Sequence, residues 1–183
     1  MRVDLPTVKI GRITLREISR FDYMDYFEIG KDPEVCKYLS WGPLIYPSEA
    51  LYAMDNFFMP RPLNGLPTGY AIVIGGKMVG VIDYHTYYKE INAVEIGYVL
   101  NKEYWNKGIM TQCLKKCIEI GFKHLEVDKI LIGHLNVNIA SQKVILKSGF
   151  KYESQKIVNI KGENLLSSNY SIHRFEYEGG LLW

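Results

Sequence analysis

A glycine between an apolar run and a helical pattern is the first residue whose position suggests chemistry. The run Val94 to Leu100 is followed by a polar turn, and Trp105 to Gly108 then leads into a helix. The first amides of a helix have no partners within it and lie at the positive end of its dipole. A glycine there lets the backbone approach a ligand closely. The segment therefore predicts an anion site that binds a phosphate or pyrophosphate.

A carboxylate lies within the same apolar run. Glu95 stands between Val94 and Ile96, which predicts a buried position on a central strand. An unpaired carboxylate among apolar side chains holds a proton more readily than it does in water. Glu95 is therefore a candidate proton acceptor that acts through ordered water. A structural ion pair is the alternative.

Two nucleotide-binding patterns are absent from the chain. A P-loop needs Lys and then Ser or Thr after its glycine, whereas Ile109 and Met110 follow Gly108. The dinucleotide pattern GxGxxG does not occur. A phosphate-bearing carrier held by backbone amides, without a metal, fits these residues better.

The elements that must position these residues alternate along the chain. The helix after the Val94 strand has to cross over to the next strand, which favours one parallel pair in a mainly antiparallel sheet. Ligands of such sheets bind at the carboxyl ends of the strands, where Gly108 lies. Apolar alternation and capping signals predict strands over Ile10–Glu17, Gly69–Gly75, Met78–Tyr87, Val94–Leu100, Lys129–Leu135, Phe150–Val158 and Tyr170–Tyr177, and helices over Asp22–Ile29, Asp32–Leu39, Ser48–Phe58, Gly108–His124 and Ile139–Ser148.

Composition narrows the class of protein. The 183 residues carry a net charge of +2 with no basic stripe, which argues against nucleic acid as a partner. No apolar run reaches the ~18 residues of a membrane helix. Three scattered cysteines predict reduced thiols in a cytoplasmic protein, and Cys113 and Cys117 are expected to pack in the core and bind no metal. We expect one domain over residues 1–183, with its core at about 10–177.

Four anchors in order resemble the GNAT superfamily of acyl-CoA-dependent N-acetyltransferases, in its RimJ/RimL-like branch. They are Glu95 to Tyr98, Trp105 to Thr111, Asn138 with Ser141, and Gly149-Phe150. The resemblance covers roughly residues 10 to 177. It implies an α/β fold with a mixed, mainly antiparallel sheet of about seven strands flanked by helices. It also implies a splay between the strands Val94–Leu100 and Lys129–Leu135.

The resemblance implies acetyl-CoA as cosubstrate and no metal. The pyrophosphate would lie on amides from Asn106 to Thr111, and the pantetheine arm beside the strand that carries Val99 and Leu100, as an added strand would. Trp105 and Met110 depart from the general superfamily pattern. The residues expected at the cofactor are Tyr98, Val99, Leu100, Trp105, Asn106, Lys107, Gly108, Ile109, Met110, Thr111, Asn138 and Ser141.

Acyl transfer from a thioester to an amine needs a neutral amine and help for the departing thiolate. The resemblance implies that Ser141 donates a hydrogen bond to the sulfur, while a helix-capping role shared with Asn138 is the alternative. The tyrosine that many relatives carry one turn later is here Ile145. The second choice for a base after Glu95 is His134, because histidine titrates near neutrality.

The acceptor is the least defined part of the reaction. A primary amine of a protein N-terminus and a small-molecule amine both remain open, the latter as in resistance or metabolic acetyltransferases. A non-catalytic acyl-CoA binding domain is a further alternative, and a homodimer is common among relatives. The residues expected to line the acceptor site are Trp41, Tyr46, Phe57-Phe58, the hairpin Tyr84 to Tyr88 and the loop Lys161 to Ser168.

Overall fold

The computed structural model describes residues 3–180, so the outermost residues of the expected domain, 1–2 and 181–183, lie outside the described part. The helices are α1 (Tyr23–Gly30), α2 (Pro47–Ala53), α3 (Ile109–Lys123), α4 (Ile139–Lys147) and α5 (Arg174–Glu178), and a 3₁₀ turn, η2, spans Val35–Tyr38. The strands are β1 (Val8–Ile10), β2 (Ile13–Glu17), β3 (Tyr70–Ile74), β4 (Lys77–Tyr88), β5 (Ala93–Leu100), β6 (Lys129–Leu135), β7 (Lys151–Ile160) and β8 (Glu163–His173).

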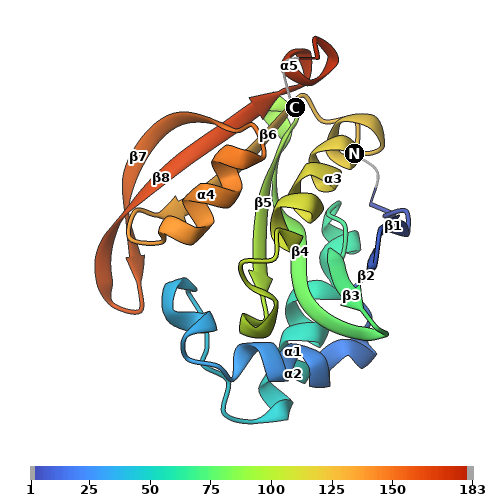
Figure 1. Cartoon of the computed structure of the whole chain (residues 1–183), viewed down its shortest axis with the longest axis vertical. Helices are drawn as coiled ribbons and strands as arrows, with labels where there is room; N and C mark the ends of the chain where they lie inside the picture. Colours follow the sequence, from blue (N-terminus) through green and yellow to red (C-terminus); the bar gives the residue numbers. More distant parts are fainter. Residues whose placement is uncertain (1–2, 181–183) are drawn as a thin grey trace.

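One sheet holds these strands in the order β1-β2-β3-β4-β5-β6-β8-β7. Neighbouring strands are antiparallel except β5 and β6, which are parallel because α3 crosses over between them. In Figure 1, β7, β8 and α4 lie on one side of β5, and α3 with the early strands lies on the other. The mixed, mainly antiparallel fold is confirmed, with eight strands in place of about seven.

Helices cover both faces of the sheet. One core cluster packs α3 and Ile145 of α4 against the face that carries Val94 and Ile96. A second cluster packs α1 and α2 against the opposite face, which carries Val81 and Val99. Since side chains alternate along a strand, β5 presents successive residues to the two clusters. The strand is therefore reached from both sides of the sheet.

The predicted splay is present at the parallel pair. The pairing of β5 with β6 ends at Ile96 and Ile132, although β5 runs on to Leu100 and β6 to Leu135. From Gly133 onward β6 stays paired with β8 only. Within residues 3–180, the last four residues of β5 therefore have no strand paired on the β6 side.

Four predicted elements differ from the structure. The helix expected over Ser48–Phe58 ends as α2 at Ala53 and continues as a π-helical turn to Phe58. The single strand expected over Ile10–Glu17 is a hairpin of β1 and β2, which supplies the eighth strand. The helix expected over Asp32–Leu39 shrinks to η2. The last strand ends at His173 and α5 follows, because Glu176 accepts a hydrogen bond from the His173 amide as a helix cap.

Among residues 3–180, no helix is long and apolar enough to cross a membrane.

Candidate active site

A cavity of about 390 Å³ lies where β5 has lost its parallel neighbour. Its walls come from the end of β5, the start of α3, one side of α4 and η2. Every residue predicted to contact the cofactor lines it except Lys107, whose ammonium group instead donates to the Glu103 carbonyl oxygen at 2.7 Å. The full lining is Val35, Tyr38, Leu39, Tyr98, Val99, Leu100, Tyr104, Trp105, Asn106, Gly108, Ile109, Met110, Thr111, Asn138, Ala140, Ser141, Lys143, Val144 and Lys147.

The loop before α3 is shaped by two left-handed residues. Asn106 has φ 57° and Gly108, the N-cap of α3, has φ 68°. No side chain caps this helix, so its first amides, from Ile109 to Thr111, are left without helical partners beside the cavity. Lys143 and Lys147 add positive charge from one face of α4. The arrangement suits an anionic group.

The backbone of β5 offers hydrogen-bonding groups to the same cavity. The Asn101 amide donates to the Val79 carbonyl oxygen at 2.8 Å, and antiparallel pairs alternate in direction. Val99 therefore directs its backbone groups at β4, and Tyr98 and Leu100 direct theirs toward the splay. The Leu100 carbonyl oxygen already accepts from the Trp105 indole at 2.7 Å. Of the two residues expected beside the pantetheine arm, only Leu100 therefore directs its backbone toward the splay, while Val99 lines the cavity with its backbone groups directed at β4.

Two hydroxyl groups meet between β5 and α4. Tyr98 Oη lies 2.8 Å from Ser141 Oγ. Burial raises the pKa of Tyr98 to about 12, even though the hydrogen bond with Ser141 acts to lower this pKa. The Ser141 amide also donates to Asn138 Oδ1 at 3.1 Å, so Asn138 is the N-cap of α4. Helix capping is the alternative to a role of Ser141 at the sulfur. A tyrosine hydroxyl thus stands beside α4 although Ile145 of that helix is apolar and buried.

A second cavity of about 890 Å³ lies on the α1–α2 face. It shares Leu39, Tyr98 and Val99 with the first cavity. Aromatic side chains make much of its wall and a few charged groups make the rest. The full lining is Tyr26, Leu39, Ser40, Trp41, Leu44, Ser48, Glu49, Tyr52, Ala53, Phe57, Phe58, Arg61, Val81, Asp83, His85, Gly97, Tyr98 and Val99.

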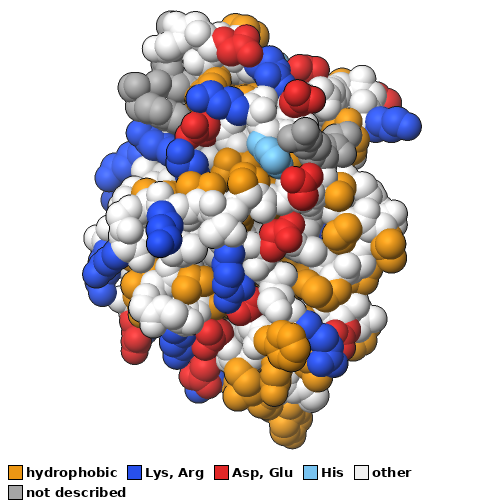
Figure 2. Space-filling view, turned by 90° about the vertical axis from the view of Figure 1, so that its right-hand side faces the viewer, with side chains coloured by type: hydrophobic (Ala, Val, Ile, Leu, Met, Phe, Trp, Pro, Cys, Tyr) orange, Lys and Arg blue, Asp and Glu red, His pale blue; other side chains and the backbone are white. Residues whose placement is uncertain are grey.

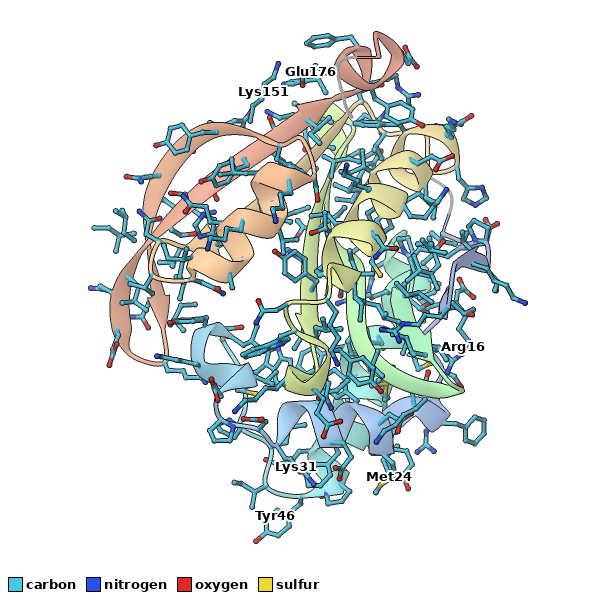
Figure 3. All side chains as sticks on the ribbon, in the orientation of Figure 1. Arg16, Met24, Lys31, Tyr46, Lys151 and Glu176 are labelled. Carbon is cyan, nitrogen blue, oxygen red and sulfur yellow. The ribbon has the colours of Figure 1, made fainter. Side chains whose placement is uncertain are left out.

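Only some of the residues expected at the acceptor site line the second cavity. Trp41, Phe57 and Phe58 line the second cavity. Tyr46 does not line it: Figure 3 shows Tyr46 projecting from the lower edge, away from the sheet. From the Tyr84–Tyr88 segment only His85 contributes. The segment expected as the loop Lys161 to Ser168 is instead mostly strand β8, and it lines neither cavity.

Apolar side chains gather outside this second cavity. Figure 2 shows them at the lower end of the molecule, where α1 and α2 lie. Tyr52 and Phe57 line the second cavity and are exposed, and Ile45 and Tyr46 are exposed as well. The approach to the cavity is therefore apolar as well.

The two candidate bases from sequence lie outside both cavities. Glu95 is half-buried rather than buried, and Tyr88 Oη donates to its Oε2 at 2.8 Å. Its role as proton acceptor stays a prediction. His134 is buried against Tyr170, with Nδ1 2.8 Å from the Leu135 carbonyl oxygen and Nε2 3.3 Å from Tyr170 Oη. These contacts hold His134 within the β6–β8 pair, and its role as the second choice for a base stays a prediction.

An ion pair between Arg61 and Asp83 in the wall of the second cavity was not predicted from the sequence. Asp83 is buried and its Oδ2 accepts from Arg61 Nη1 at 2.5 Å. Arg61 comes from the proline-rich segment before β3, which gives no sequence signal of a partner 22 residues away. An acidic residue in the apolar pattern of β4 is the one signal that could have found this pair.

Cys113 and Cys117, as expected, pack in the core, where burial raises the pKa of both thiols.

Known proteins are similar to this chain in sequence, and solved structures are similar to it in fold. The uncharacterized N-acetyltransferase p20 of Bacillus licheniformis is 26% identical over 179 residues, covering 96% of this chain and 100% of the relative. The structure of RimL, a ribosomal L7/L12 alpha-N-protein acetyltransferase in complex with coenzyme A, superposes with a TM-score of 0.82 at 18% identity, covering 92% and 98% of the two chains. The microcin C7 self immunity acetyltransferase MccE, in complex with acetyl-CoA and AMP, superposes with a TM-score of 0.80 at 19% identity, covering 90% and 93%.

The profile of the acetyltransferase (GNAT) domain matches residues 12–151, most of the chain. The match includes β5, the turn into α3 and the start of α4, which together form the first cavity. The chain belongs to the GNAT family and is an acyl-CoA-dependent N-acetyltransferase.

Proposed function

We propose that the first cavity binds acetyl-CoA, that the second binds a primary amine, and that the acetyl group passes directly between them. The observation that carries this is the shared wall. Tyr98 and Val99 line both cavities at the stretch of β5 that β6 has left. A thioester brought along β5 and an amine from the α1–α2 face would meet there without an intermediate carrier.

The walls of the first cavity fit acetyl-CoA. The amides from Asn106 to Thr111 supply donors for the pyrophosphate, and the left-handed Gly108 leaves open space in front of them. Lys143 and Lys147 complement further phosphate charge. The free backbone groups of Tyr98 and the Leu100 amide face the path of the amide-bearing pantetheine arm.

Tyr98 and Ser141 are placed to stabilise the departing sulfur. With a pKa raised to about 12, the Tyr98 hydroxyl stays protonated at neutral pH and acts as a donor. It is a weaker acid than an ordinary thiol of pKa ~8.5, so it does not surrender its proton to the thiolate. The pair lowers the barrier by hydrogen bonding, and the proton on the sulfur comes from the amine.

The second cavity supports an amine attached to an apolar or aromatic body. Its volume of about 890 Å³ lies within the range of small-molecule sites. Aromatic faces such as those of Trp41 and Tyr52 also attract an ammonium group. RimL is an acetyltransferase of a protein α-amine, and MccE was solved with acetyl-CoA and the small molecule AMP, so the fold accommodates both a protein terminus and a small molecule.

A thiol-release assay with a panel of amines tests this function. We expect CoA release from acetyl-CoA with monoamines such as 2-phenylethylamine or with peptides that carry a free N-terminus. Polyamines should be poorer acceptors, because the cavity has few free acids. The proposal would be overturned if CoA bound tightly and no amine of either class released it, which would favour a binding domain.

A further inference from the structure

Two polar atoms face one point above Gly97 in the second cavity. A Cβ atom at this residue would lie 3.3 Å from Asp83 Oδ1 and 3.4 Å from His85 Nε2. The same atom would come within 2.9 Å of His85 Cδ2. The His85 ring therefore already takes the space of a side chain at Gly97, and a carboxylate oxygen and an imidazole nitrogen come together over this glycine on the wall of the second cavity; we call this polar corner of the cavity the niche.

The strand geometry places this niche next to the shared wall. The register of β4 against β5 shifts between Tyr84 and Thr86, so that His85 is the extra residue of a bulge. A bulge redirects a side chain, and such irregularities are common beside active sites. Gly97 immediately precedes Tyr98, which lines both cavities. The niche thus lies on the acceptor side of the proposed transfer point.

Asp83 Oδ1 and His85 Nε2 are both placed to accept a hydrogen bond from an amine. Arg61 occupies Asp83 Oδ2, which leaves Oδ1 directed at the niche. His85 Nδ1 lies 2.8 Å from Thr86 Oγ1. When Nδ1–H donates to that hydroxyl, the lone pair is on Nε2. A hydrogen-bond acceptor and a proton acceptor then face the same position.

We propose that His85 Nε2 takes the proton of the acceptor amine in the niche above Gly97, where Asp83 Oδ1 holds the ammonium group. This inference rests on the proposed acetyl transfer between the two cavities. It assigns the base to a residue of β4 in place of Glu95 on β5. His85 is exposed, so the imidazolium can pass its proton on to solvent.

The protons and bonds balance as follows. The substrate ammonium gives one proton to His85 Nε2 and becomes a neutral amine. Its nitrogen forms a bond with the thioester carbonyl carbon as the C–S bond breaks. A second amine proton passes to the departing sulfur, so the products are an acetamide, a thiol and one proton released to solvent.

Chemical rescue tests the assignment. His85→Ala should lower kcat/KM for the amine about a hundredfold or more, the scale of a lost general base. The probe amine is the best substrate in the panel with 2-phenylethylamine and N-terminal peptides. Free imidazole should restore part of the rate, because the removed ring leaves a solvent-accessible space. CoA affinity measured by calorimetry should stay unchanged.

His124→Ala is the matched control. This histidine contacts the Asp4 carbonyl oxygen beyond the end of α3 and lines neither cavity, so its loss should leave kcat/KM unchanged without any imidazole effect. Gly97→Ala is the second variant. Its methyl group would press on the His85 ring, at 2.9 Å from Cδ2, and displace the ring from Asp83. We expect KM for the amine to rise about tenfold or more while CoA affinity is kept.

The outcomes separate this inference from the proposed function. If wild type releases CoA with an amine but His85→Ala keeps its rate, or loses it without imidazole rescue, the assignment of His85 is wrong and acetyl transfer stands. Under those conditions a loss in Glu95→Gln would return the role to Glu95. If wild type transfers to no amine, both proposals fail together.

Discussion

At the scale of single residues, the site depends on contacts that cross the chain. Tyr98 on β5 brings its hydroxyl to Ser141 at the start of α4, 43 residues later. The position on α4 where relatives carry a tyrosine holds Ile145, so the sequence suggested that such a hydroxyl was missing. The hydroxyl is supplied from the strand instead. Local patterns give the type of each residue and not which distant side chain it meets.

Removing the Tyr98 hydroxyl tests its proposed role at the departing sulfur. Tyr98→Phe should lower kcat about tenfold to a hundredfold, the effect of losing a hydrogen bond worth ~1.5–3 kcal/mol to a charged group. Steady-state kinetics with acetyl-CoA would measure this, and KM for acetyl-CoA should change little.

Ser141→Ala and the double variant complete a mutant cycle. Since the two hydroxyls form one hydrogen-bonded pair, the double variant should lose less activity than the product of the two single losses. Losses that multiply, or a single loss confined to KM, would instead indicate two independent binding contacts.

At the scale of elements, sequence patterns located most strands and helices, and even the bounds of β6, but they missed several ends. The parallel pair and the splay followed from one rule, that α3 must cross over between β5 and β6. The β1–β2 hairpin was missed because its turn at Gly11 lies inside an alternation that reads as one strand. The end of β8 was missed because Glu176 acts as a cap, whose partner is visible only in the structure.

The start of α3 gives a prediction with an internal control. Gly108→Trp should abolish measurable CoA binding in calorimetry, because the indole would cover the free amides. Gly108→Ala bears the same left-handed backbone penalty of roughly 1–2 kcal/mol. Its Cβ meets only Gln112 Nε2, at 3.9 Å.

The alanine variant should therefore bind CoA with nearly the wild-type affinity while melting at a lower temperature. Equal affinities for both Gly108 variants would argue that the pyrophosphate lies elsewhere.

At the scale of the whole molecule, an ion pair between Lys151 and Glu176 joins the terminal helix α5 to the edge strand β7 of the sheet. Glu176 of α5 is buried beside the first residue of β7, and Figure 3 shows Lys151 and Glu176 together at the upper end. Burial raises the pKa of Glu176, but the His173 amide and Lys151 outweigh it, so the pKa is lowered overall. The ionised carboxylate therefore stabilises the folded state.

The sign of this shift predicts a pH dependence. Stability from Glu176 is present above the ordinary carboxyl pKa of 4.5 and is lost as pH falls through the lowered folded value. Glu176→Gln should destabilise the protein by about 1 kcal/mol at pH 7, and the difference from wild type should shrink toward pH 3. Urea unfolding across this range measures it, with exposed Glu163→Gln as the control that should show no such trend.

The wall shared by the two cavities has a kinetic consequence. Because the cavities lie on opposite faces of β5, neither substrate has to leave before the other arrives. Initial-rate plots at several fixed concentrations of the second substrate should then give intersecting lines. A single compound that joins the sulfur of CoA to an aromatic amine through a two-carbon bridge would span both cavities. It would gain affinity from each half, since the second half binds at the high effective concentration set by the linker.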